Sequence, residues 1–131
     1  MARKPESTFC TGVHKHLPKA LYVLKNNNPF VGGIPDVWYS GNAADLWVEY
    51  KWVPRVPKHG RVEPAKLLSA LQTDWLRRRY TEGRDVAVII GCPEGGVLLC
   101  DLDWEKTVEG FPSLVKSRPD LARWIESKTT R

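Results

Sequence analysis

The chain has 131 residues, of which 42% are hydrophobic and 27% charged, and it contains ten Gly and ten Pro. This length suits one compact domain, and the composition excludes collagen-like repeats, low complexity and wholesale disorder. Lys and Arg number 20 against 15 Asp and Glu, a net charge of +5 that favours a polyanionic partner without identifying one. No apolar run reaches the roughly 20 residues of a membrane-spanning helix and no secretion signal is present, so we expect a cytoplasmic protein.

The N-terminal part of the chain is predicted to contain a tail, a helix and a strand. Residues 1–5 have the composition of a flexible basic tail. Residues 6–16 have the pattern of a short helix that is interrupted near Gly12 and ends before Pro18. Alternating apolar residues over 20–24 then predict the first strand.

The next stretch has the pattern of a β-hairpin. Two strand-like runs, 34–40 and 45–52, flank a short turn that begins with Gly-Asn. If the residues that flank the turn pair with each other, the antiparallel register places Asp36 opposite Glu49. Because side chains alternate between the two sides of a strand, one side is predicted to be a core face and the other polar and aromatic: Val37, Tyr39, Leu46, Val48 and Tyr50 on the first, and Asp36, Trp38, Trp47, Glu49 and Lys51 on the second.

The rest of the chain is predicted to contain a basic loop over 53–62 and a helix over 64–83. Two short strands follow, over 85–90 and 97–100, and a terminal helix over 119–128 lies within a C-terminal helical extension, 101–131. In the long helix, Leu67, Leu68, Leu71, Trp75 and Leu76 recur at intervals that predict one buried face. The expected fold is therefore a single α/β domain with a mixed β-sheet of four to five strands flanked by helices.

Two carboxylates and an ammonium share one side of the predicted hairpin. Asp36 and Glu49 would have Cβ atoms about 4.5 to 5.5 Å apart, where like charges destabilise a sheet. A divalent cation reverses this effect, because Mg²⁺ binds hard oxygen ligands, commonly one or two carboxylates together with substrate phosphate. Lys51 follows on the same side, where it would hold a phosphate oxygen or orient the attacking water. The alternative is a solvated sheet face with a surface Glu–Lys pair.

At these residues the sequence resembles a nuclease superfamily. Pro35-Asp36 followed by Glu49-Tyr50-Lys51 is similar to the Pro-Asp…(Asp/Glu)-x-Lys motif of the restriction-endonuclease-like nucleases. Over residues 30–92 the chain resembles the virus-type replication-repair nuclease (VRR-NUC) domain, because Ser69-x-x-Gln72-x-x-Trp75-Leu76 and the strand at 86–90 follow in the same order.

The resemblance implies a restriction-endonuclease-like core that hydrolyses phosphodiester bonds with Mg²⁺ or Mn²⁺. It implies that Asp36, Glu49 and the backbone carbonyl of Tyr50 hold the metal. It also implies that Lys51 is the catalytic lysine and that Gln72 reaches toward the site from its helix. The alternative role for Gln72, which lies at the border of the buried stripe, is to cap a buried backbone group.

The same resemblance implies an acidic ligand on the first helix and a particular substrate. Glu6 is the acidic residue that precedes Asp36, and it is therefore the candidate for that ligand. The resemblance also implies that the chain acts as a homodimer on branched DNA such as Holliday junctions, as small stand-alone phage and viral members do. A viral chain of this kind would act in the host cytoplasm.

Positive charge is concentrated in two places that are predicted to contact DNA. One is the loop that carries Arg55, Lys58 and Arg61, and the other is the helix that carries Arg77 and Arg78. For the helix, the alternative is a solvated face, because consecutive residues fan out around a helix.

The three cysteines, Cys10, Cys92 and Cys100, cannot all pair within one molecule, which fits a reducing compartment. Together with His14 they would supply four zinc ligands, but their spacing matches no common zinc pattern, so we expect free thiols.

The sequence thus predicts a divalent-metal-dependent endonuclease that selects branched DNA. The alternative from another class is a non-catalytic nucleic-acid-binding protein on a nuclease-like fold, and a third is a small zinc-stabilised adaptor.

Overall fold

The fold is built on one mixed sheet. The computed structural model describes residues 4–26 and 32–131, and the strands are β1 (Tyr22–Lys25), β2 (Val37–Ser40), β3 (Asp45–Trp52), β4 (Val86–Cys92) and β5 (Gly95–Leu99). Their order in the sheet is β1-β2-β3-β4-β5, with β3 and β4 parallel and the other neighbours antiparallel. The predicted mixed α/β sheet of four to five strands is confirmed.

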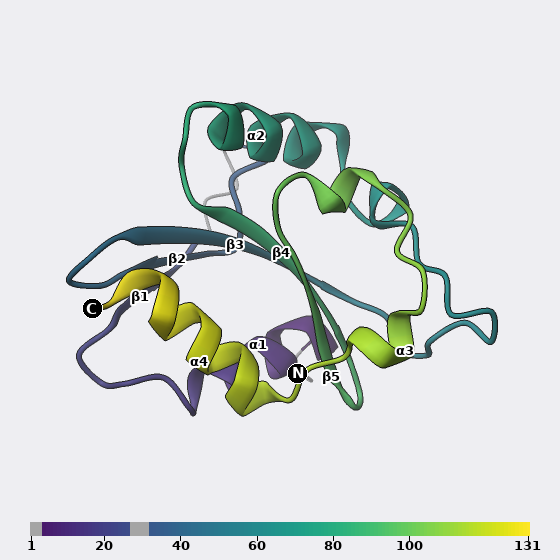
Figure 1. Cartoon of the computed structure of the whole chain (residues 1–131), viewed down its shortest axis with the longest axis horizontal. Coiled ribbons are helices and arrows are strands. Elements are labelled where there is room, and N and C mark those ends of the chain that lie inside the picture. The colour runs from purple at the N-terminus through teal and green to yellow at the C-terminus, as the bar shows by residue number, and fades with distance from the viewer. Residues whose placement is uncertain (1–3, 27–31) are drawn as a thin grey trace.

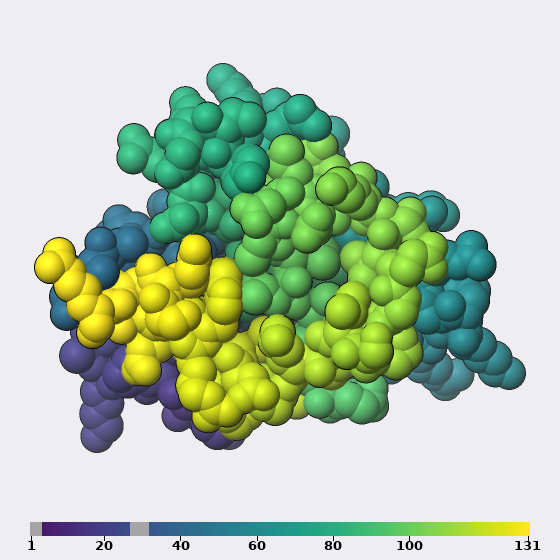
Figure 2. Space-filling model, in the orientation of Figure 1, coloured from purple at the N-terminus to yellow at the C-terminus, as the bar shows by residue number. Residues whose placement is uncertain are grey.

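Helices cover both faces of this sheet (Figure 1). They are α1 (Pro5–His14), the 3₁₀ turn η1 (Pro64–Lys66), α2 (Ala70–Thr81), the 3₁₀ turn η2 (Asp103–Glu105), α3 (Phe111–Leu114) and α4 (Arg118–Thr129). Helices α1 and α4 contact each other on one face, and α2 lies on the opposite face. In the space-filling view the C-terminal residues, light green to yellow, cover much of the visible surface (Figure 2). Within the described residues, none of the helices is long and apolar enough to span a membrane.

Each face of the sheet has its own apolar core. On the α1 and α4 face, the inward residues of β2 and β3 pack with Phe9, Val13 and Ile125. On the α2 face, Leu76 and Trp104 pack against alternate residues of β4. All seven residues of β4 are buried, as expected for a strand that is covered on both faces.

The predicted hairpin register is confirmed in β2 and β3. Ser40 pairs with Asp45 and Val37 pairs with Val48, and the five residues predicted to form the core face are at most 1% exposed. The ladder stops at Val37, one pair short of the predicted pairing of Asp36 with Glu49.

Several local predictions were wrong or shifted. Helix α1 continues through Gly12, because burial of Phe9 and Val13 outweighs the modest helix penalty of one glycine. The helix predicted over 64–83 is divided into η1 and α2. Leu71, predicted to be buried, is 62% exposed.

Candidate active site

The end of the β2–β3 ladder is shaped by the side chain of Asp36. Its Oδ2 accepts a hydrogen bond of 2.9 Å from the backbone N–H of Tyr50, which points out of β3 toward β2. Trp47 and Val53 donate their N–H groups to the carbonyls of Asp85, just before β4, and Gly91, within β4, at 3.1 and 2.9 Å. Backbone groups alternate sides along a strand. The Tyr50 carbonyl therefore faces the same edge as its N–H group, beside Asp36.

Glu49 is a buried carboxylate with unequal oxygens. The residue is 1% exposed, and its Oε2 accepts from Gln72 Nε2 at 3.0 Å and lies 3.3 Å from Lys51 Nζ. Its Oε1 is buried without a hydrogen-bond partner, a property it shares among the described residues with Trp104 Nε1. Buried polar atoms are normally satisfied, so this oxygen requires an explanation.

The acidic groups affect one another's ionisation. Burial first, and then the charge of Asp36, raise the pKa of Glu49 from 4.5 to about 8, against the opposing effect of Lys51. Burial raises the pKa of Asp36 as well, although the Tyr50 N–H, Lys51 and a hydrogen bond from Glu49, when its carboxyl is protonated, oppose this. Burial and the charge of Asp36 raise the pKa of Glu6. Without a cation, the site thus disfavours full ionisation of its carboxyls.

A cavity of about 80 Å³ adjoins this cluster, and its lining includes Glu6, Asp36 and Tyr50. It has room for an ion with several waters. Glu49 does not line this cavity and lies on the α2 side of the sheet, so Glu6 and Glu49 approach Asp36 from opposite faces.

The residues present fit a hard divalent cation. Among residues 4–26 and 32–131, no three acidic, His or Cys side chains gather closely enough to form a metal site by themselves. Asp36, the free Oε1 of Glu49 and the Tyr50 carbonyl are nevertheless oxygen donors of the kind that Mg²⁺ uses when water and substrate phosphate complete its shell. A cation would also satisfy the unpartnered oxygen and offset the repulsion between the carboxyls.

Gln72 contacts Glu49 and also caps a backbone group, although that group is exposed and not buried as the sequence alternative supposed. Its Oε1 accepts from the backbone N–H of Ser69 at 2.9 Å, which caps helix α2, while its Nε2 donates to Glu49. The sequence reasoning noted Ser69 as part of a motif but missed its contact, although Ser-x-x-Gln before a helix is a capping-box signature.

The arginines of α2 are engaged in ion pairs. Arg77 Nη2 lies 2.5 Å from Glu105, and Arg78 Nη1 lies 3.4 Å from Asp74. A DNA phosphate would have to compete with these carboxylates for either guanidinium.

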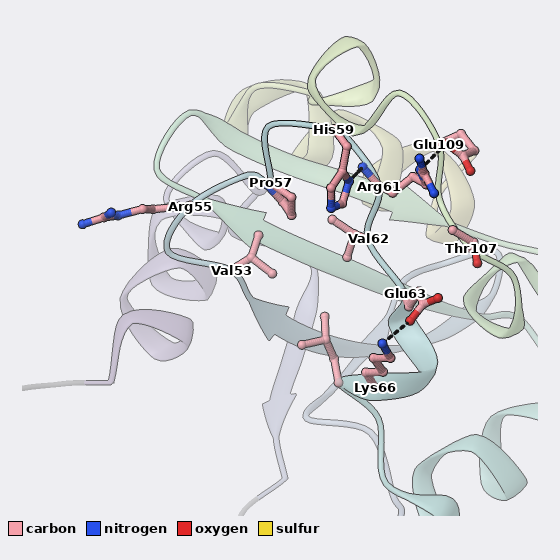
Figure 3. Close-up of a pocket in the computed structure, with 11 residues that line it drawn as sticks. Val53, Arg55, Pro57, His59, Arg61, Val62, Glu63, Lys66, Thr107 and Glu109 are labelled. Atoms are coloured by element: carbon pink, nitrogen blue, oxygen red, sulfur yellow. Dashed lines mark hydrogen bonds and ion pairs between the residues drawn. The ribbon is translucent and has the colours of Figure 1, made fainter.

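A pocket of about 550 Å³ lies beyond the end of β3, between the loop at 53–62, η1 and residues 107–109 (Figure 3). Arg61 pairs with Glu109 at 3.5 Å, and Lys66 pairs with Glu63 at 2.7 Å. Arg55 extends away from the other lining side chains.

Arg55 and Lys58, two exposed cations of the same loop, form no ion pair with any of the described residues. They are therefore the most available of the five cations predicted to contact DNA.

The four zinc candidates do not come together. Cys10 Sγ lies 3.4 Å from His14 Nε2 in the core under α1, whereas Cys92 belongs to the core on the opposite face. The three thiols are free, as expected.

Comparison with known proteins identifies the fold. The sequence matches no family model and none of the curated protein sequences with which it was compared. Its structure is similar to that of Hjc, a Holliday junction resolvase from the archaeal hyperthermophile Archaeoglobus fulgidus, with a TM-score of 0.55 and 14% sequence identity. The alignment covers 92% of this chain and 97% of Hjc. The chain therefore shares the fold of this structure, as expected from the core predicted by the sequence, while its resemblance to the VRR-NUC domain stays a prediction.

Proposed function

We propose that residues 1–131 form a single nuclease domain, a divalent-metal-dependent DNA endonuclease that cuts branched DNA such as Holliday junctions. The observation that carries this proposal is the buried Glu49, which has one unpartnered oxygen and lies beside Asp36 and Lys51. The likeness to Hjc, a Holliday junction resolvase, supports the branched substrate. We further infer the VRR-NUC type of small phage or viral nuclease from the Ser69-x-x-Gln72 helix that follows Glu49-x-Lys51.

Each residue of the cluster has a distinct task in this proposal. Asp36, Glu49 and the Tyr50 carbonyl hold Mg²⁺ or Mn²⁺, and Glu6 supplies a further carboxylate from α1. When bound, such an ion stabilises the negative charge that develops on the phosphoryl oxygens.

Lys51 is the cationic group of the site. Its side chain is 18% exposed and keeps hydrogens free beyond its contact with Glu49. It can therefore donate to a non-bridging phosphate oxygen or orient the attacking water.

DNA contacts in this proposal begin at the loop that follows β3. The unpaired Arg55 and Lys58 bind backbone phosphates, with Arg61 beside them, while Arg77 and Arg78 contribute less because of their ion pairs. Symmetric cutting of a four-way junction requires two active sites, so we propose that two copies of the chain act together.

The test is cleavage of labelled duplex, flap and four-way substrates in Mg²⁺, Mn²⁺, Ca²⁺ or EDTA. We expect junction cleavage with Mg²⁺ or Mn²⁺, much less with Ca²⁺ and none in EDTA. Asp36→Asn should lose roughly 1000-fold or more in rate while it still binds the junction.

Asp45→Asn is the matched control, because Asp45 is an exposed carboxylate at the other end of β3 that bonds Ser40. It should cleave like the wild type. Cleavage in EDTA, or by Asp36→Asn at the wild-type rate, would reject the proposal, and junction binding by the wild type without cleavage would favour the non-catalytic alternative.

A further inference from the structure

The Gln72 side chain is held at both ends. Its Oε1 accepts from Ser69 N at 2.9 Å, and its Nε2 donates to Glu49 Oε2 at 3.0 Å. In return, Ser69 Oγ accepts from Gln72 N at 3.1 Å, which completes a reciprocal capping box at the start of α2.

The capping box decides which end of the amide faces Glu49. An amide has one accepting and one donating end, and only the donating end is compatible with a carboxylate. Because the Ser69 N–H binds the Gln72 oxygen, the NH₂ group is left to face Glu49. A flipped amide would lose the bond to Ser69 N and place its oxygen against a carboxylate oxygen.

The amide in turn orients Glu49. Gln72 and Lys51 both approach Oε2, and Oε1 is left without a partner. A partial rotation of the carboxyl group, which turned both oxygens away from these positions, would remove this asymmetry. The group that sets the Gln72 amide therefore also sets the direction in which Glu49 presents an unpartnered oxygen to a cation.

We propose that Ser69 is a positioning residue of the metal site: its hydroxyl accepts from Gln72 N and thereby holds the N-cap turn in which the Ser69 backbone N–H meets the Gln72 amide that orients Glu49. This inference rests on the proposed function for the metal, and it assigns a role to a residue that touches neither metal nor substrate. The alternative hypothesis is that Ser69, as the N-cap residue of α2, contributes only to the stability of that helix.

The chain contains a matched control for the effect of losing an N-cap hydroxyl. Ser117 is the N-cap of α4, and its Oγ accepts from Asp120 N at 3.1 Å, the same distance as in the cap of α2. Both helices have 12 residues. Helix α4 packs on the opposite face of the sheet from Gln72, so loss of the Ser117 hydroxyl should weaken a helix without reaching Glu49.

The experiment compares Ser69→Ala, Ser69→Thr and Ser117→Ala in the full chain. The Gln72 side-chain NH₂ signals are recorded in ¹H–¹⁵N spectra of the metal-free protein, and Mn²⁺ affinity is measured by titration. Ser69→Ala should move or average the Gln72 signals and weaken Mn²⁺ binding roughly 3- to 10-fold, a smaller loss than for a direct hydrogen-bond partner of a ligand. Ser69→Thr should restore the wild-type Gln72 signals and Mn²⁺ affinity. Ser117→Ala should leave the Gln72 signals in place and the Mn²⁺ affinity within about 2-fold of the wild type.

Equal behaviour of Ser69→Ala and Ser117→Ala in both measurements would overturn the proposal. Ser69→Gly serves if the alanine variant does not fold, because glycine is nearly as good an N-cap as serine and lacks the hydroxyl. A wild-type protein that binds no Mn²⁺ would reject the metal site and thus the proposed function, whereas the metal-free spectra would still decide whether Ser69 fixes Gln72.

Discussion

Two neighbouring residues of β3 differ in how their buried polar groups are satisfied: the one on the α1 face has a hydrogen-bond partner, and the one on the α2 face has an oxygen without a partner. Tyr50 and Glu49 are each 1% exposed. On the α1 face, the Tyr50 hydroxyl lies 2.6 Å from the Tyr39 hydroxyl, which in turn lies 2.7 Å from His14 Nε2. On the α2 face, Glu49 keeps one oxygen unpartnered.

This difference separates a structural network from a functional one. A chain of satisfied hydroxyls specifies and stabilises a core, whereas an unsatisfied buried carboxylate lowers stability until something binds it. Loss of the polar groups of Tyr39 or His14 should therefore affect mainly folding, and loss of Glu49 should affect mainly cleavage.

The largest expected effect comes from Glu49→Gln, which is nearly isosteric and keeps an acceptor for Gln72. Cleavage should fall roughly 1000-fold or more, because an anionic oxygen donor is lost. The metal-free variant should nevertheless be more stable than the wild type near pH 8, as measured by urea unfolding. Lower stability of the variant at that pH would contradict our account of the α2 face.

The pH dependence follows from the raised pKa of Glu49. In the folded protein this pKa is about 8, against an ordinary 4.5, so the stabilising contribution of the protonated group is complete below pH 4.5 and is lost as the pH rises through 8. Metal-free wild type should lose on the order of 4 kcal/mol relative to Glu49→Gln across this window. Mg²⁺ should offset the loss in the wild type and leave the variant unchanged.

On the α1 face, Tyr39→Phe removes the middle of the hydrogen-bonded chain. The hydroxyl of Tyr50 and the ring of His14 lose their shared partner, which should cost about 1 to 3 kcal/mol in the free energy of unfolding. Cleavage at saturating Mg²⁺ should stay within about 3-fold of the wild type. Tyr22→Phe is the control, because Tyr22 is 54% exposed and its change should stay within about 0.5 kcal/mol.

His14 gives the α1 face a pH dependence of the opposite sign. Burial, and secondarily the charge of Lys25, lower the pKa of His14 from 6.5 to about 4. Stability from the neutral ring is therefore complete above pH 6.5 and is lost as the pH falls through 4, by roughly 3 kcal/mol. His14→Gln should flatten this acid limb in thermal unfolding without changing the loss between pH 6.5 and 8.

The smallest effect is expected outside both cores. Arg77→Gln removes an ion pair whose arginine is exposed and should change the melting temperature little, with little change in junction affinity. Arg55→Gln should weaken junction binding and reduce its salt slope by about one. Salt-dependent binding curves that rank the two variants in the reverse order would place the DNA on α2 instead.

What the sequence determined by itself is the hairpin and its two faces. Alternation over 34–52 fixed the register of β2 and β3, because a slip of one residue would turn Tyr39 and Tyr50 out of the core. The same pattern placed Glu49 and Lys51 together, and the continuous apolar run of β4 predicted a strand covered on both faces. These features depend on local periodicity, which can be recognised in a single amino-acid sequence.

Only the tertiary structure decided how the surrounding elements meet that hairpin. The bond from Tyr50 N to the Asp36 side chain, the contact of Gln72 with Glu49 and the pairing of Arg77 with Glu105 join residues 14 to 28 positions apart. Such contacts depend on how a helix packs on a sheet, where a rotation of a few tens of degrees redirects every side chain without changing the apolar pattern. The unpartnered oxygen of Glu49 arises at this level, because burial and hydrogen-bond supply are properties of the packed molecule.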